Sequence, residues 1–326
     1  MALVAAIAAI LALAGVFSNG DDEQPVPATT TVPVGGPDAP EPVTGDGATR
    51  PRVTTVRVGG RPTAVLAGPG GVWVADSFSR RASVLDSESK DAKPTAFSLE
   101  GPASDVAATD DAAWFALPEQ QALERRHAKG PEGSGELIEV AGFPSVLAGA
   151  DEAVYALSDR AVEAIDADTA EVVDEFRLGG FGSGLAVGEG YVWAAVDNRD
   201  VVRIDPESGE SDGGVPVPEV FTVTADGGFV WALSASDRLT RIAPDTLEAT
   251  VAPQSVRGAL DVAAGLGSVW VTSSRRTVTQ LDPESLEPRG APLKVGDEPG
   301  SVSVDAEAVW VANGGDGTLT RIEPER

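Results

Sequence analysis

The sequence contains no cysteine, and His127 is its only histidine among 326 residues. Without cysteine the chain can form no disulfide bond, thiolate metal site or thiol nucleophile. With one histidine it offers no Cys or His pair for a transition metal, and its serines lack a matching histidine base. The sequence therefore predicts no catalytic residue and no metal ligand of these kinds.

Basic residues are also scarce. The chain has 24 Lys and Arg against 51 Asp and Glu, which gives a formal net charge of −27 and a pI near 4.2. Such a surface repels phosphate backbones, so we expect no nucleic-acid partner. Solubility is the simplest role of this acidity; cation binding and adaptation to a salty medium are the alternatives.

A long hydrophobic run occurs only at the N-terminus, where Ala2 to Phe17 are all apolar or small. A helix of this length covers about 24 Å, slightly less than the ~30 Å hydrocarbon core. We expect residues 1–20 to form a transmembrane helix or signal anchor. No Lys or Arg precedes the run, which leaves open a late start, an atypical or cleaved signal, or a fragment of a longer membrane protein.

Acidic residues follow this run directly, at Asp21, Asp22 and Glu23, so the positive-inside rule places the rest of the chain outside the cytoplasm. Residues 21–52 are rich in Pro, Thr, Gly and Asp and show no hydrophobic periodicity. Such a composition cannot bury enough apolar surface to offset chain entropy. We therefore expect a disordered, extended linker between the membrane and the remaining residues, 53–326.

One phrase recurs through residues 53–326 with a period near forty. Each copy is centred on an aromatic residue, and the successive steps are 41, 41, 38, 38, 39 and 40 residues. A single aromatic per forty-residue repeat is typical of a β-propeller blade. The aromatic residues are Trp73, Trp114, Tyr155, Trp193, Trp231, Trp270 and Trp310.

Each repeat predicts four antiparallel strands, a to d, with Gly- and Asp-rich turns between a and b. Strand c recurs as an alternating segment that ends at a proline, as in Thr240-Arg-Ile-Ala-Pro244. The recurring aromatics are expected to pack between neighbouring sheets as framework rather than to form a binding cage. The fold class predicted is therefore all-β, a seven-bladed β-propeller of four-stranded antiparallel blades.

The number of strands predicts how the ring closes. The chain ends after strand c of the seventh repeat, and a spare strand, Val53 to Val58, precedes the first. We predict that this N-terminal strand completes the last blade and closes the ring, because an open ring would expose edges able to pair with other chains. The second repeat departs from the pattern: Gln120 to Gly130 is charged and lacks β-branched residues, so we expect an irregular blade or a helical turn there.

These repeats, above all Gly-Ser-Val-Trp-Val-Thr and Glu-Ala-Val-Trp-Val-Ala-Asn-Gly-Gly-Asp-Gly-Thr-Leu-Thr-Arg-Ile, resemble those of extracytoplasmic bacterial propellers of the YVTN, NHL-like and streptogramin-lyase-like type. The resemblance spans residues 53–326. With an anchor and a linker before it, the chain looks most like the outer domain of membrane-anchored receptor kinases. Members of this group include enzymes, ligand binders and receptor domains. We expect a membrane-tethered, non-catalytic binding or sensor domain for an envelope ligand or protein, and a monomeric propeller; an envelope scaffold that only positions partners is a further alternative.

Arginine recurs in the predicted b–c and d–a loops of this acidic chain. We predict that Arg61, Arg81, Arg257 and Arg276, with Asp197 and Asn313 from the same loops, form a site for an anionic or glycan-like ligand. The alternative is that each arginine pairs with a nearby carboxylate in a solvated salt bridge.

Acidic turns recur in the c–d loops at Asp86, Asp205 and Asp282, where the sequence predicts turn formation rather than a calcium loop. Streptogramin-lyase-like relatives use a histidine base and a bound metal, but His127 does not match a blade loop. A metal-dependent lyase or lactonase is the alternative function. We predict no cofactor for the binding domain, whereas Ca²⁺ or Mg²⁺ is the ion that carboxylate-rich loops would accept in the alternative.

Overall fold

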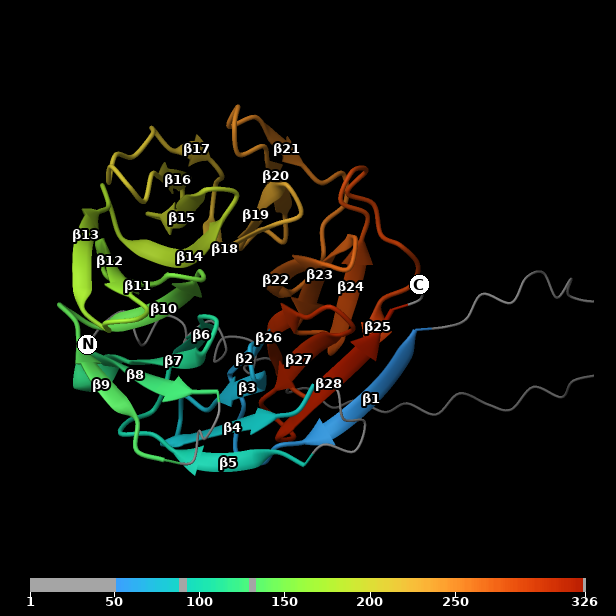
Figure 1. Cartoon of the computed structure of the whole chain (residues 1–326). Helices are drawn as coiled ribbons and strands as arrows, with labels where there is room; N and C mark the ends of the chain where they lie inside the picture. The colour runs from blue at the N-terminus through green and yellow to red at the C-terminus, as the bar shows by residue number, and fades with distance from the viewer. Residues whose placement is uncertain (1–50, 88–92, 129–132, 325–326) are drawn as a thin grey trace, which may run out of the picture. The chain divides into compact units, whose positions relative to one another are not determined.

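Short segments of β-branched and small apolar residues, separated by Gly- and Asp-containing turns, form the strands of a ring of β-sheets (Figure 1). The computed structural model describes residues 51–87, 93–128 and 133–324. The predicted membrane segment (1–20) and all but the end of the predicted linker (21–52) lie outside these ranges. Within the described ranges, no helix has the length and apolarity needed to cross a bilayer.

The described residues form seven four-stranded antiparallel sheets, which confirms the predicted blade count. From strand a to strand d, the blades are β2 Ala64–Gly68, β3 Gly71–Ala75, β4 Arg81–Leu85 and β5 Thr95–Ser98; β6 Asp105–Ala108, β7 Ala112–Leu117, β8 Ala122–His127 and β9 Glu136–Glu139; β10 Pro144–Gly149, β11 Ala153–Ser158, β12 Ala161–Asp166 and β13 Val172–Arg177; β14 Gly182–Gly188, β15 Tyr191–Val196, β16 Asp200–Ile204 and β17 Val215–Pro216; β18 Val220–Asp226, β19 Phe229–Ser234, β20 Leu239–Ile242 and β21 Ala249–Val251; β22 Ala259–Gly265, β23 Ser268–Ser273, β24 Thr277–Leu281 and β25 Leu293–Lys294; β26 Pro299–Val304, β27 Val309–Asn313, β28 Thr318–Glu323 and β1 Arg52–Arg57.

The seventh blade is closed by the N-terminal strand, as predicted. β1 pairs antiparallel with β28 over six residue pairs, from Arg52 opposite Glu323 to Arg57 opposite Thr318. In Figure 1 the blue β1 lies beside the red β28 at the outer edge of this blade. The ring therefore has no open side between its first and last repeats.

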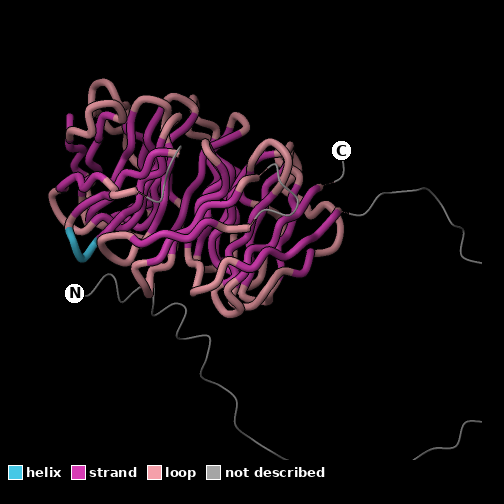
Figure 2. The backbone as a smooth tube through the Cα atoms, turned by 60° about the horizontal axis from the view of Figure 1, so that its bottom comes forward, coloured by secondary structure: helices cyan, strands magenta, loops and turns pink. Residues whose placement is uncertain are grey.

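The second blade is more regular than the sequence indicated. β8 is a full six-residue strand that pairs with both β7 and β9, and the helical turn is the 3₁₀ segment η2, Pro118–Gln120, in the loop before it (cyan in Figure 2). Charged side chains can be buried in this strand because they form hydrogen bonds and an ion pair with each other: Glu124 Oε1 accepts a hydrogen bond from Arg126 Nε at 2.8 Å. A buried ion pair here replaces the β-branched residues of the other blades.

The recurring aromatics are framework residues, as predicted. The six tryptophans are almost fully buried, and each lies in an apolar cluster between two neighbouring blades. Four of them donate the indole N–H to a backbone carbonyl four or five residues earlier, as Trp73 does to Pro69 at 2.8 Å. Each of these four thereby fixes its own a–b turn while it packs on the adjacent sheet.

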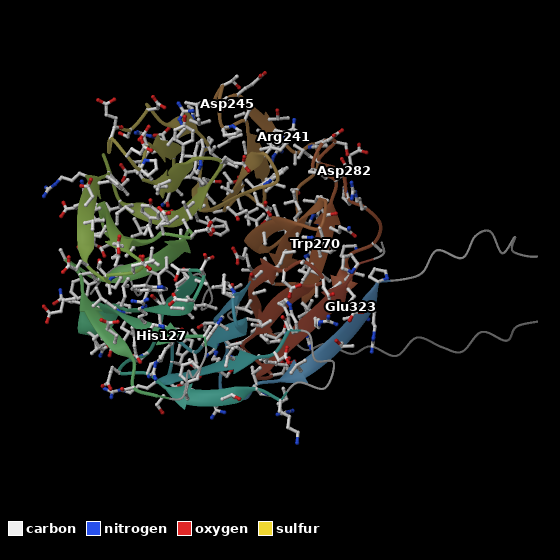
Figure 3. All side chains as sticks on the ribbon, in the orientation of Figure 1. His127, Arg241, Asp245, Trp270, Asp282 and Glu323 are labelled. Carbon is white, nitrogen blue, oxygen red and sulfur yellow. The ribbon has the colours of Figure 1, made fainter. Side chains whose placement is uncertain are left out.

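Arginines of strand c provide a second contact between blades. Arg203 and Arg241 stack on the aromatic ring at the start of strand b, with the guanidinium 4.4 and 4.6 Å from the ring centroids of Tyr191 and Phe229. Each also donates to a carbonyl in the c–d turn of the next blade; Arg241 reaches Pro283 at 2.8 Å. Figure 3 shows Arg241 between Asp245 of its own blade and Asp282 of the next.

Antiparallel strands alternate in direction, so the connections fall on two ends of the ring. The b–c loops and the d–a connections lie at one end, which we call the Arg/Phe face. The a–b and c–d loops lie at the other, which we call the acidic face. Because β1 runs antiparallel to β28, Arg52 and Glu323 both lie at the acidic face.

Replacing Arg241 with leucine tests the contact between the fifth and sixth blades. The Arg241→Leu variant loses two hydrogen bonds and a cation–π contact, so we expect its free energy of unfolding to fall by about 1–3 kcal/mol. Arg238→Leu is the matched control, because Arg238 is exposed on the same blade. Urea unfolding measures both; equal stability of the two variants would contradict the assignment.

Candidate functional site

The channel at the centre of the ring is lined by the first strand of every blade. β2, β6, β10, β14, β18, β22 and β26 contact one another around the ring, and each is the end strand of its sheet. The inner edge of each strand therefore has no ladder partner. Its N–H and C=O groups need other partners or remain open to the channel.

Side chains of a neighbouring blade meet some of these free edges. Asp105 Oδ2 accepts a hydrogen bond from the Leu147 N–H, and Asp261 Oδ2 accepts one from the Val302 N–H, both at 2.9 Å. Ser301 Oγ accepts one from the Val65 N–H at 3.3 Å. Asp105, Asp261 and Ser301 occupy equivalent positions on strand a of their blades. Each stands two residues before the strand-a residue that pairs with the framework Trp of strand b.

The two aspartates are poorly hydrated. Each keeps a partly exposed surface toward the channel, but the surrounding blades remove most of its water. Burial raises the pKa of the Asp105 carboxyl to about 7 and that of Asp261 to about 6, against the opposing effect of the backbone hydrogen bonds. The charge of Asp261 raises the pKa of Asp105 further, although the two belong to the second and sixth blades.

Beyond this layer the channel is apolar. A cavity of about 320 Å³ opens toward the acidic face and is lined by residues 66–69, 106–108, 147–149, 185–187 and 223–225 of the first five blades. No titratable side chain contributes to this lining. The cavity can therefore accept a small apolar group, with unpaired strand edges as its hydrogen-bonding groups, but it holds no acid or base.

At the Arg/Phe face the mouth of the channel is set by one residue of each d–a connection. In each blade this residue precedes by three positions in the sequence the residue equivalent to Asp105 or Asp261. Most of the seven are exposed. Arg61 Nη2 and Glu298 Oε2, from neighbouring connections, form an ion pair at 2.7 Å. In ring order the seven are Arg61, Pro102, Phe143, Phe181, Glu219, Gly258 and Glu298.

Exposed phenylalanines gather on the Arg/Phe face. Phe78, Phe143 and Phe181 are 56%, 48% and 45% exposed, whereas the other exposed large hydrophobic residues of the described ranges lie on outer strands. The Arg61 guanidinium stacks on Phe78 at 4.5 Å, and the Arg160 guanidinium on Phe181 at 4.0 Å from the ring centroid. Exposed aromatic and arginine side chains are the residues most enriched in protein interfaces.

The charges divide between the two faces. Connections at the Arg/Phe face carry eight arginines and ten carboxylates, whereas the described loops of the acidic face carry nineteen carboxylates against Lys93 and Arg289. Five of the eight arginines have no carboxylate within ion-pair distance among the described residues: Arg80, Arg160, Arg238, Arg257 and Arg275. The Arg/Phe face is therefore nearly neutral in a protein of charge −27.

The predicted site residues all lie on the Arg/Phe face, but they do different things there. Arg61 and Arg276 are paired, with Glu298 at 2.7 Å and with Asp297 at 3.5 Å, which fits the salt-bridge alternative. Arg81 and Arg257 are exposed and have no carboxylate within ion-pair distance in the described part of the chain. Both remain available to an anionic ligand.

The two polar residues of the predicted site hold the backbone. Asp197 Oδ1 accepts a hydrogen bond from the Phe181 N–H at 2.8 Å. The Asn313 side chain is fully buried; it donates to Thr318 and Thr320 and accepts from the Gly296 N–H. Ligand binding by the six residues stays a prediction, and their common location supports this face as the binding face.

Sequence reasoning missed Phe143, Phe181 and Arg160. The signal was present in the dipeptides Gly142-Phe143 and Gly180-Phe181, where a large apolar residue follows glycine in a predicted d–a loop. It also missed two buried glutamates on strand c: Glu124 accepts from the Glu100 N–H, and Glu163 from the Ala141 N–H. These carboxylates hold the d–a connections in place.

The acidic turns and the histidine lie away from the mouth. Asp205 and Asp282 each accept two backbone N–H groups of their own turn, which confirms turn formation there. The Ser285 N–H, followed by Arg289, holds the pKa of Asp282 below its usual range. His127 is exposed at the acidic-face end of β8, with Nδ1 3.5 Å from Asp111 Oδ2 (Figure 3).

Comparison with known proteins shows the fold. No protein-family model matches the chain, and no curated protein sequence matches it. Among solved structures it is similar to virginiamycin B lyase from Staphylococcus aureus, with a TM-score of 0.72, 17% identity, and coverage of 84% of this chain and 100% of the lyase.

A streptogramin B lyase structure matches with a TM-score of 0.71 at 14% identity, covering 85% of this chain and 98% of that one. BamB from Moraxella catarrhalis matches with a TM-score of 0.60 at 12% identity, covering 83% of this chain and 98% of that one. At such identities the likeness establishes the seven-bladed propeller and carries no activity across.

The raised pKa values of the channel aspartates predict a stability that depends on pH. The folded state binds more protons than the unfolded chain between about pH 4 and 7, so the free energy of unfolding should fall by about 1–4 kcal/mol as the pH rises through this range. Asp105→Asn should flatten this dependence, because the amide oxygen still accepts the Leu147 N–H but does not titrate. Asp245→Asn, an exposed acid, is the control.

Urea unfolding between pH 5 and 8 measures the effect. Above pH 5 the carboxylates with lowered pKa values, Asp166, Asp205 and Asp282, remain ionised and do not contribute. A wild-type stability that is flat or rises with pH over this interval would refute the burial of the channel carboxyls.

Proposed function

We propose that the chain is a membrane-tethered, extracytoplasmic binding module without catalytic activity. In this proposal residues 1–20 anchor it, residues 21–52 form the linker, and a monomeric propeller holds a protein or other envelope ligand on its Arg/Phe face. A longer receptor, with a kinase domain before the membrane segment, is consistent with this arrangement. The binding face is the same in both settings.

The observation that carries the proposal is the concentration of exposed Phe and unpaired Arg side chains on one nearly neutral face. Leaving three large aromatic rings in water is unfavourable, at roughly 25 cal/mol for each Å² that a partner would cover. In the described part of the chain, the other exposed large apolar side chains lie on outer strands of the blades. A partner that covers Phe78, Phe143 and Phe181 recovers this free energy.

The arrangement of the tether favours the same face. β1 begins at Arg52 on the acidic face, so the linker would join the ring at the end opposite the Arg/Phe face. The Arg/Phe face is thus free of the attachment point.

The alternative function is a metal-dependent lyase or lactonase, which the likeness to two lyase structures favours. The residues present do not fit such a centre. Among the described residues, no group of three or more His, Asp or Glu side chains is placed to hold a metal ion. His127 lies at the opposite end of the ring from the mouth, so it is not placed to act as a base beside Ca²⁺ or Mg²⁺ at the mouth.

The absence of native cysteine gives a direct test of location. Full-length chain carrying Asp245→Cys should react with a membrane-impermeant maleimide in intact cells, because Asp245 is exposed and the propeller lies outside the cytoplasm in this proposal. The wild-type chain is the unreactive control. Labelling that appears only after cell lysis would place the propeller inside and refute the proposal.

A photo-crosslinking amino acid at single positions tests the binding face. At Phe143 or Phe181 we expect a discrete adduct with one cellular component in the membrane fraction, and at Asp245 on the acidic face we expect none. The adduct should weaken when the second phenylalanine is changed to serine. Adducts formed only from Asp245 would assign binding to the acidic face instead.

A further inference from the structure

The Arg/Phe face is divided into two unlike halves. Six buried side-chain polar atoms of the described residues have no hydrogen-bond partner, and four of them lie on this face. They fall one to a blade in the first four blades: Ser79 Oγ, Gln120 Oε1, Ser158 Oγ and Ser183 Oγ. Buried polar atoms without partners are rare in folded proteins, so four at one place indicate a missing partner.

The exposed phenylalanines lie in the same half. Phe143 and Phe181 occupy the mouth position of the third and fourth blades, and Phe78 belongs to the first. Each mouth phenylalanine has an unpaired hydroxyl next to it. Ser158, 4% exposed, is the register partner of Pro144, which follows Phe143, and Ser183 stands two residues after Phe181.

Arg160 supplies a guanidinium beside the mouth phenylalanine Phe181. Its guanidinium covers one face of the Phe181 ring at 4.0 Å and has no carboxylate within ion-pair distance among the described residues. A stacked guanidinium keeps its N–H edges free for a carboxylate. The other half of the mouth carries Glu219 and Glu298, which repel a carboxylate and so fix the direction in which an acidic ligand lies.

We infer that the half of the mouth formed by the first four blades binds an extended peptide segment of a partner protein, with apolar side chains on Phe143 and Phe181 and an Asp or Glu on Arg160. This inference rests on the proposed function and specifies its ligand. An extended peptide presents N–H and C=O groups at regular intervals, and a serine hydroxyl can donate to the C=O or accept from the N–H. A change of side-chain rotamer would bring the Ser158 and Ser183 hydroxyls, which lack a partner in the free protein, to such groups.

A glycan fits these observations less well. Sugar rings stack on open aromatic faces, but Arg160 already covers one face of Phe181. The rings at the mouth are phenylalanines, which have no polar group to share with a sugar hydroxyl. Phe and Arg side chains are both enriched in protein–protein interfaces.

The test is a selection from phage-displayed random peptides on the full-length chain in mild detergent. We expect enrichment of peptides that combine large apolar residues with Asp or Glu. Synthetic peptides from the selection should bind Phe143→Ser, Phe181→Ser and Arg160→Gln about tenfold or more weakly in fluorescence anisotropy. All three side chains are exposed, so thermal melting should show folded variants.

Two matched controls share the chemistry but not the location. Leu137→Ser removes an apolar side chain of the same 48% exposure as Phe143 from the outer strand β9. Arg57→Gln removes an exposed arginine of the outer strand β1 that has no carboxylate within ion-pair distance among the described residues. Both should leave peptide affinity unchanged.

The remaining outcomes overturn the inference. Absence of enrichment, or selected peptides that bind the Phe143 and Phe181 variants as well as wild type, would do so. A chitin oligosaccharide that binds in a Phe143- and Phe181-dependent manner while peptides do not would assign the half-mouth to a glycan. If either result accompanies a discrete crosslink from Phe181 in cells, the binding face stands and only the peptide inference fails.

Discussion

The pairing of β1 with β28 is the interaction on which the rest of the structure depends. Six residue pairs join the N-terminal strand to the last repeat. The other six blades each consist of four consecutive strands and need no strand from elsewhere in the chain. Each framework Trp packs on an adjacent sheet, and the strand-c arginines of several blades reach the next c–d turn. Because the ring is closed, these contacts continue around it without a break, and every blade packs between two neighbouring blades.

Closure also turns sequence repeats into spatial neighbours. Residues about forty positions apart come to surround one axis, and equivalent positions form layers around the channel. The framework layers keep the same residue type in nearly every repeat. The mouth layer does not: it contains Arg61 and Glu298 on one side and Phe143 and Phe181 on the other. A varied layer on a uniform framework is the expected location of binding specificity.

The free inner edges of the first strands impose a second requirement. An edge strand normally pairs with another strand, but none of the described strands pairs with these inner edges. Asp105 and Asp261 meet that requirement with carboxylates, whereas Ser301 and Ser303 do so with hydroxyls. The aspartates accept this position at the cost of desolvation, which links the stability of the ring to pH.

The fold could be predicted from the sequence because a period, one aromatic per period and a spare strand are visible in one dimension. The regularity of the second blade could not, because the partners of its charges, such as the Glu100 N–H for Glu124, lie outside the local pattern. The raised pKa of Asp105 depends on burial within the channel, which no local pattern records. Each mouth phenylalanine lies near a serine whose hydroxyl has no hydrogen-bond partner. This placement depends on the register of strands a and b and on the bulges after Pro144 and Gly182, which the neighbouring strands determine.

The direction of β1 has a mechanical consequence. Arg52 lies at the acidic face and Phe143 and Phe181 at the other, so a partner held at the mouth and a tether before Arg52 would pull the ring from opposite ends. In the proposed arrangement such a force would enter the ring through β1, so the six residue pairs that close the seventh blade would also carry the load of the tether.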